Sequence, residues 1–155
     1  MTQQSIRHAT FVIERTYPAA PSRVFDAWAN PAFKARWFKG PDEWAKAPHE
    51  LDFRVGGTER VSGGGPGGPV HRYAARYMDI VKDRRIITAY EMYLDDRRIS
   101  VSVATVQLEP EGAGTRLIYT EQGVFLEGSD GPALREQGTR ELFDNLERAL
   151  QHATG

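Results

Sequence analysis

Residues 130–151, which read DGPALREQGTRELFDNLERALQ, decide the fold because they predict a long amphipathic helix. Asp130, Gly131 and Pro132 mark its start, since proline is favoured in the first helical turn. At 100° per residue, apolar and small side chains fall on one arc and charged or amide side chains on the other. The apolar arc contains Leu134, Gly138, Leu142, Phe143, Leu146, Ala149 and Leu150. We therefore expect a helix over residues 132–151 that lies with one face against an apolar surface.

The surface that this helix covers is predicted to be a β-sheet. Stretches rich in β-branched and aromatic residues favour strands, and glycine, proline and aspartate mark the breaks between them. We expect seven strands, over residues 9–17, 50–55, 58–62, 70–81, 85–94, 98–109 and 115–126. Several of these strands are long, so the sheet must twist and curl. The glycine-rich segment SGGGPGGP at 62–69 is short enough to be a hairpin loop.

Two short helices are expected between the first and second strands, in PSRVFDAWANPAFKARWF at 21–38. Ser22 is predicted to cap the first helix, and Asn30-Pro31 to separate it from the second. Runs of strands followed by a helix indicate an α+β fold with an antiparallel sheet, in a single domain over residues 1–155.

Composition excludes several function classes. The chain of 155 residues has no cysteine, which excludes a disulfide scaffold, a thiol nucleophile and a cysteine-ligated metal. Its 20 Lys and Arg balance 21 Asp and Glu, which argues against a nucleic-acid partner. No apolar stretch approaches the roughly 20 residues that span a bilayer, and the N-terminus lacks the apolar core of a signal peptide. We expect a cytoplasmic protein without membrane insertion.

Four segments together with the last helix resemble a known family. They are VIERTYPAAPSRVFDAWANPAFKARWF at 12–38, LDFRVGGTERV at 51–61, ARYMDIVKDRRIITAYEM at 75–92 and GTRLIYTEQGVF at 114–125. The chain resembles the heat-shock-protein-90 ATPase activator homologue-like family of the START-like (SRPBCC) superfamily, over about residues 8–151. The most specific part is the Asp-x-Arg-x-Gly-Gly signature, formed by Asp52, Arg54, Gly56 and Gly57.

This resemblance implies a helix-grip fold, in which a curved seven-stranded antiparallel sheet wraps around the long C-terminal helix. It also implies a deep cavity between them, which across the superfamily binds lipids, polyketides and other apolar ligands. Many relatives carry Gly-Trp early in the last helix, whereas this chain has Gly138-Thr139, which makes the cavity wall smaller or more polar there. The eukaryotic co-chaperone has an extra N-terminal module, and we expect none here, which argues against chaperone activation.

Alternation along the strands identifies the side chains that face the helix. In 70–81 it places His71, Tyr73 and Tyr77 inward, opposite a face that carries arginines. In 85–94 it places Tyr90 and Met92 on one face. Aromatic rings with polar tips suit a cavity that orients an apolar ligand, although ordinary core packing explains them equally well.

Two charged residues stay ambiguous at this level. Glu121 shares a face with apolar residues of strand 115–126, and our preferred interpretation is an exposed strand end with a solvated carboxylate. The alternative is an inward carboxylate that is paired with Arg54 or His71 and acts as a general base. For Arg54, a salt bridge to Asp52 or Glu59 beside a turn at Gly56 and Gly57 is slightly preferred over ligand binding.

Further motifs restrict the chemistry. We assign Trp28 to the core, and Trp37-Phe38 is the better candidate for a contact at the mouth of a cavity. The glycine-rich segment lacks the Lys-Ser/Thr of a phosphate-binding loop, so a mobile hairpin tip that gates the cavity is preferred. The four histidines lack the spacing of a metal site, and no Gly-x-Ser-x-Gly nucleophile motif is present.

The sequence therefore favours a protein that binds a small or medium-sized hydrophobic molecule, without catalytic residues, metal or cofactor. The residues expected to line its cavity are Trp37, Arg54, His71, Tyr73, Tyr77, Tyr90, Met92, Glu121, Leu134, Gly138 and Leu142. One alternative is an enzyme of the cyclase or hydratase kind that uses His71 or Glu121 as its acid or base. Another is a chaperone-interaction module, which would act through its surface. The oligomeric state stays open.

Overall fold

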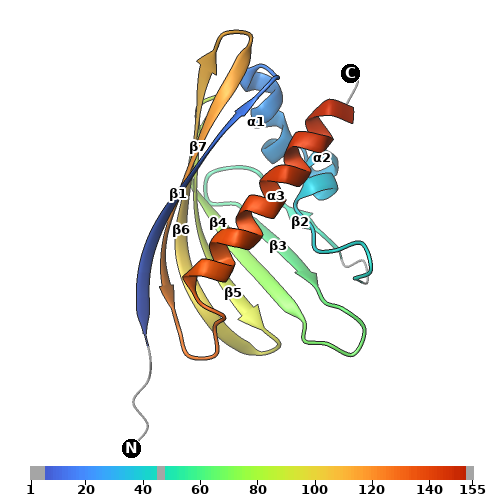
Figure 1. Ribbon diagram of the computed structural model, residues 1–155, viewed down its shortest axis with the longest axis vertical. Helices are drawn as coiled ribbons and strands as arrows, with labels where there is room; N and C mark the ends of the chain where they lie inside the picture. The colour runs from blue at the N-terminus through green and yellow to red at the C-terminus, as the bar shows by residue number, and fades with distance from the viewer. Residues whose placement is uncertain (1–5, 45–47, 153–155) are drawn as a thin grey trace, which may run out of the picture.

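A curved antiparallel sheet of seven strands wraps around one long helix in the computed structural model (Figure 1), which describes residues 6–44 and 48–152. The strands are β1 (Arg7–Tyr17), β2 (Glu50–Leu51), β3 (Thr58–Gly63), β4 (His71–Val81), β5 (Arg85–Leu94), β6 (Arg97–Glu111) and β7 (Gly114–Phe125). Their order in the sheet is β1-β7-β6-β5-β4-β3-β2. The α+β helix-grip fold expected from the sequence is confirmed.

Helix α3 (Pro132–His152) crosses the concave face of the sheet (Figure 1). Its second half is fixed to β1, where the Tyr17 hydroxyl donates to the Phe143 carbonyl at 3.0 Å and Arg15 pairs with Asp144 at 2.7 Å. Phe143 is buried and its ring lies 5.1 Å from that of Tyr119 on β7. The predicted helix and its apolar face are thus confirmed.

Helices α1 (Pro21–Ala29) and α2 (Pro31–Trp37) close one end of the fold beside the second half of α3 (Figure 1). The prediction that Ser22 caps α1 is wrong. Ala20 occupies the cap position without a side-chain hydrogen bond, because Pro21, whose φ suits the first helical turn, starts the helix two residues earlier than a Ser22 cap would. Asn30 ends α1 and caps α2, since its side chain accepts from the amides of Ala32 and Phe33.

The strand expected over 50–55 is much shorter, because the chain leaves the sheet after Leu51. The following residues form a turn in which Gly57 N donates to Arg54 O at 2.8 Å. Gly56 has a φ of +85°, a conformation that favours glycine. A Cβ on Gly57 would come within 2.1 Å of the Asp52 carbonyl, so this position needs glycine for space. The signature therefore builds a turn.

The remaining strands agree with the sequence within two residues at each end. The hairpin expected at the glycine-rich segment connects β3 with β4, and Gly63 pairs with His71 at its base. A register shift between Tyr77 and Asp79 on β4 accompanies the curvature of the sheet. This curvature lifts the middle of the sheet away from the first half of α3, and side chains of both elements line the space between them.

Candidate functional site: a cavity between sheet and helix

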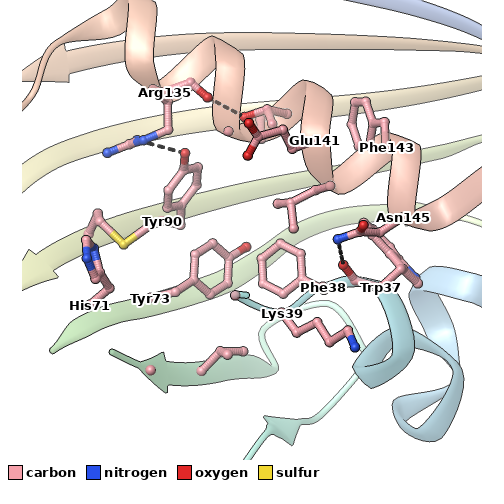
Figure 2. Close-up of a pocket in the computed structure, with 18 of the residues that line it drawn as sticks. Trp37, Phe38, Lys39, His71, Tyr73, Tyr90, Arg135, Glu141, Phe143 and Asn145 are labelled. Carbon is pink, nitrogen blue, oxygen red and sulfur yellow. Dashed lines mark hydrogen bonds between the residues drawn. The ribbon is translucent and has the colours of Figure 1, made fainter. Parts of the chain in front are cut away.

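A cavity of about 890 Å³ lies between the concave face of the sheet and helix α3. Strands β3 to β7, helices α1, α2 and α3 and the segments after α2 and before α3 contribute to its wall. Figure 2 shows aromatic side chains from the strands and from α2 converging below α3. The volume is that of sites that enclose small organic molecules.

The sheet side of the cavity is aromatic. His71 and Tyr73 on β4 and Tyr90 and Met92 on β5 line it, which confirms the inward face predicted for these strands. The ring of Tyr73 lies 4.9 Å from that of Tyr90 and 4.9 Å from that of Phe38 (Figure 2). These contacts hold the rings in place and give the cavity a flat, apolar wall.

The helix side is open at its centre. Leu134, Gly138 and Leu142 line the cavity as expected, and a Cβ placed on Gly138 would meet no atom within 4 Å. Leu134 is 53% exposed, so it lies toward the rim. The side chains of α3 therefore leave unfilled space against the sheet at Gly138.

Glu121 lies behind this wall. Its carboxylate is fully buried, so the preferred expectation of a solvated side chain is wrong. The hydroxyls of Tyr90 and Tyr119 each donate to it at 2.7 Å, and Arg135 lies at 3.4 Å. The inward alternative is right about burial but wrong about the partner, which is neither Arg54 nor His71.

Arg135 reaches from α3 into this cluster (Figure 2). Its guanidinium donates to the Tyr90 hydroxyl at 2.9 Å and to Ser100 Oγ at 2.7 Å. Burial alone would lower the pKa of Arg135, but Tyr90 and Glu121 raise it, so the group stays charged. Burial, reinforced by Glu121, raises the pKa values of Tyr90 and Tyr119, so both remain hydroxyl donors.

The sequence interpretation missed Arg135, although one signal pointed to it. Arg135 lies three residues before Gly138 and four before Thr139, and these spacings place the three on one face of a helix. All three line the cavity. The partner of an inward carboxylate was therefore present on the helix face that covers the sheet.

A second buried cluster joins α2 to the sheet. Lys34 Nζ lies 2.6 Å from Glu59 Oε1, the Tyr77 hydroxyl donates to the same oxygen at 2.7 Å, and His49 Nε2 lies 2.6 Å from Glu59 Oε2. Burial lowers the pKa of Lys34. Burial would raise the pKa of Glu59, but the Lys34 charge and hydrogen bonds from His49, Lys34 and Tyr77 outweigh this and lower it to about 2.

Three expected residues lie away from the lining. Arg54 pairs with Asp52 at 2.9 Å and its side chain is 68% exposed, in agreement with the salt bridge slightly preferred for this residue. Tyr77 is buried with its hydroxyl on Glu59, and Glu121 is covered by the two tyrosines. The lining therefore contains the other eight: Trp37, His71, Tyr73, Tyr90, Met92, Leu134, Gly138 and Leu142.

The tryptophans differ from their expected places. Trp37 is only 1% exposed and forms an inner wall instead of the mouth, because its indole packs 4.7 Å from that of Trp28 and donates to Ala27 O. Trp28 is in the core as expected. Trp44, which the sequence interpretation did not single out, stacks on His71 with ring centroids 5.1 Å apart.

Tyr73 and His71 are polar lining residues whose side chains are uncommitted. Within the described part of the chain, neither the Tyr73 hydroxyl nor the His71 ring has a hydrogen-bond partner.

Among the described residues, no group of three histidine, aspartate or glutamate side chains could hold a metal ion. No helix among them is long and apolar enough to cross a membrane.

Comparison with known proteins agrees with this geometry. Residues 18–151 match the family model described as activator of Hsp90 ATPase homolog 1-like protein. The chain belongs to this family. None of the curated proteins matches it significantly.

Solved structures resemble the whole chain. A putative uncharacterized protein from Rhizobium leguminosarum is 47% identical with a TM-score of 0.92, over 98% of this chain and 100% of that one. The Mll3558 protein from Rhizobium loti is 46% identical with a TM-score of 0.86, over 94% and 99%. Protein CV1439 from Chromobacterium violaceum, 24% identical with a TM-score of 0.76 over 93% and 98%, shares the fold.

Proposed function

We propose that the protein binds a small or medium-sized hydrophobic molecule in the cavity between the sheet and α3. The observation that carries this proposal is the space beside Gly138. The 890 Å³ cavity has an aromatic wall on the sheet side, and on the helix side a Cβ at Gly138 would meet no atom within 4 Å. Burying apolar ligand surface contributes about 25 cal/mol per Å², so the aromatic wall supplies most of the affinity.

The polar groups of the lining orient the molecule in this proposal. Tyr73 and His71 have no hydrogen-bond partner among the described residues, and both side chains line the cavity (Figure 2). A ligand with one polar group can therefore bond to them while its apolar part lies against Phe38 and Tyr90. Membership of a START-like family supports the same function.

Native mass spectrometry of the freshly purified protein tests the proposal. We expect a co-purified molecule, released on denaturation, whose mass identifies its chemical class. Gly138→Trp is the matched variant, because its indole would enter the space that the ligand occupies. A folded variant that retains the same molecule at the same occupancy would contradict binding at this place.

A further inference from the structure

We propose that the cavity selects uncharged molecules that carry a carbonyl or similar hydrogen-bond acceptor, and rejects carboxylates of the same size. This inference rests on the proposed binding function and names the class of ligand. It follows from how the charged groups in and around the cavity are paired.

The interior charges cancel. Among the described residues, the cations buried in the wall are Arg135 and Lys34, with side chains 13% and 3% exposed. Each has its own buried carboxylate, because Arg135 lies 3.4 Å from Glu121 and Lys34 lies 2.6 Å from Glu59. A buried charge is costly unless it is paired. A ligand carboxylate would therefore meet no unpaired buried cation in the described part of the wall.

The described charges at the rim of the cavity do not attract an anionic ligand either. Among the described residues, three exposed cations and three exposed carboxylates line it: Arg36, Lys39, Arg148, Asp42, Asp130 and Glu141. Charges of both signs in equal number create no net field that attracts an anion. Electrostatic steering therefore does not compensate for the missing counterion inside.

The hydroxyl groups specify an acceptor on the ligand. Tyr90 and Tyr119 already donate their hydroxyl protons to Glu121, so neither can donate to a ligand without breaking that bond. Tyr73 is uncommitted, and burial raises its pKa well above the ordinary value, which keeps its hydroxyl protonated. A carbonyl oxygen beside Tyr73 would satisfy this donor without burying a charge.

A matched pair of probes tests the inference on the wild-type protein. 2-Acetonaphthone and 2-naphthoate have nearly the same shape, but at pH 8 the ketone is neutral and the carboxylate is ionised. We expect isothermal titration calorimetry to give an affinity for the ketone at least about tenfold higher. Equal affinities, or tighter binding of 2-naphthoate, would overturn the inference and leave the binding function intact. Absence of binding by both would count against the binding function, and the inference would fall with it.

Removing one buried negative charge sharpens the test. Glu121→Gln leaves Arg135 without its carboxylate, so we expect 2-naphthoate to bind at least about tenfold more tightly while the ketone changes by less than about threefold. Glu136→Gln is the matched control, because it also removes one negative charge. Glu136 lies on α3 away from the cavity lining, where it pairs with Arg140 at 2.8 Å. An equal gain in both variants, or no gain in Glu121→Gln, would contradict the role of the Arg135–Glu121 pair.

Tyr73→Phe tests the acceptor. It removes the uncommitted hydroxyl and keeps the ring, so the affinity for 2-acetonaphthone should fall by about three- to tenfold, the usual worth of one hydrogen bond. The affinity for naphthalene, which has no acceptor, should not change. Unchanged ketone binding would overturn the assignment of Tyr73. Circular dichroism confirms that each variant is folded, and the wild-type comparison remains decisive if a variant is not.

Discussion

Glu59 and Glu121 are both fully buried glutamates that accept tyrosine hydroxyls and face one cation, yet they lie in different surroundings. Glu59 joins β3 to α2 through Lys34, and its tyrosine partner lies outside the cavity lining. Glu121 lies under two tyrosines that form the cavity wall, and Arg135 reaches it from the helix across the cavity.

The two clusters have similar chemistry but different neighbours. Lys34 touches the cavity, but its ammonium lies 2.6 Å from Glu59 and 3.3 Å from the Tyr77 hydroxyl, so the Glu59 cluster chiefly holds α2 on the sheet. The Glu121 cluster fixes the Tyr90 and Tyr119 hydroxyls and neutralises Arg135 beside an unfilled space. We infer that perturbing the first changes stability and that perturbing the second changes ligand selection.

The largest effect is expected from Lys34→Met. The variant leaves Glu59 buried without its cation, and removing one partner of a buried pair typically costs about 3–5 kcal/mol. Urea denaturation should show this loss in the free energy of unfolding. The double variant Lys34→Met/Glu59→Gln removes both charges and should recover much of the loss. A loss below about 1 kcal/mol in the free energy of unfolding of the single variant would show that the Glu59 cluster does not hold α2 on the sheet.

Acid should weaken the Glu59 cluster next. The pKa of Glu59 is lowered from 4.5 to about 2 in the folded protein, so its carboxylate contributes stability that is fully present above pH 4.5. That contribution, on the order of 3 kcal/mol, is lost as the pH falls toward 2. Urea titrations at several pH values should show a steeper acid loss for the wild type than for Lys34→Met/Glu59→Gln. Parallel pH profiles would contradict a strongly lowered pKa.

The variant Gly138→Trp tests whether Gly138 borders an open cavity or a filled core. Because a side chain there meets open space, we expect the free energy of unfolding to change by less than about 1 kcal/mol, whereas overpacking a filled core costs about 1–3 kcal/mol. Binding of 2-acetonaphthone should be lost. Gly138→Ala is the control and should be more stable by roughly 0.5–1 kcal/mol, from helix propensity, with binding retained. A large loss of stability in Gly138→Trp would show that no usable space exists there.

Arg54→Ala should have the smallest effect. Arg54 and Asp52 form an exposed pair with side chains 68% and 53% accessible, and such pairs contribute about 0–1 kcal/mol. Thermal unfolding and 2-acetonaphthone affinity should therefore match the wild type closely. A binding defect in this folded variant would mean that Arg54 reaches the ligand after all and that the two clusters do not account for the polar chemistry of the site.

Much of this arrangement was predictable from periodicity. The alternation in 70–81 and 85–94 correctly placed His71, Tyr73 and Tyr90 on the inner face, and the helical repeat placed Gly138 opposite them. Alternation also put Glu121 on the apolar face of its strand, but the identity of the residue favoured solvent. The pattern was the better guide, because a register that buries its neighbours buries Glu121 as well.

The sequence by itself determined all the strands but β2, the long helix, the turn at Gly56 and the inward faces of β4 and β5, because these depend on local geometry and on spacing along the chain. The tertiary structure alone decided which charges pair. Arg135 meets Glu121, and Lys34 meets Glu59, only because the curved sheet brings α3 and α2 against it. The long side chains of arginine and lysine can reach several neighbours, so spacing does not select the partner. The neutrality of the cavity is therefore a property of the folded protein.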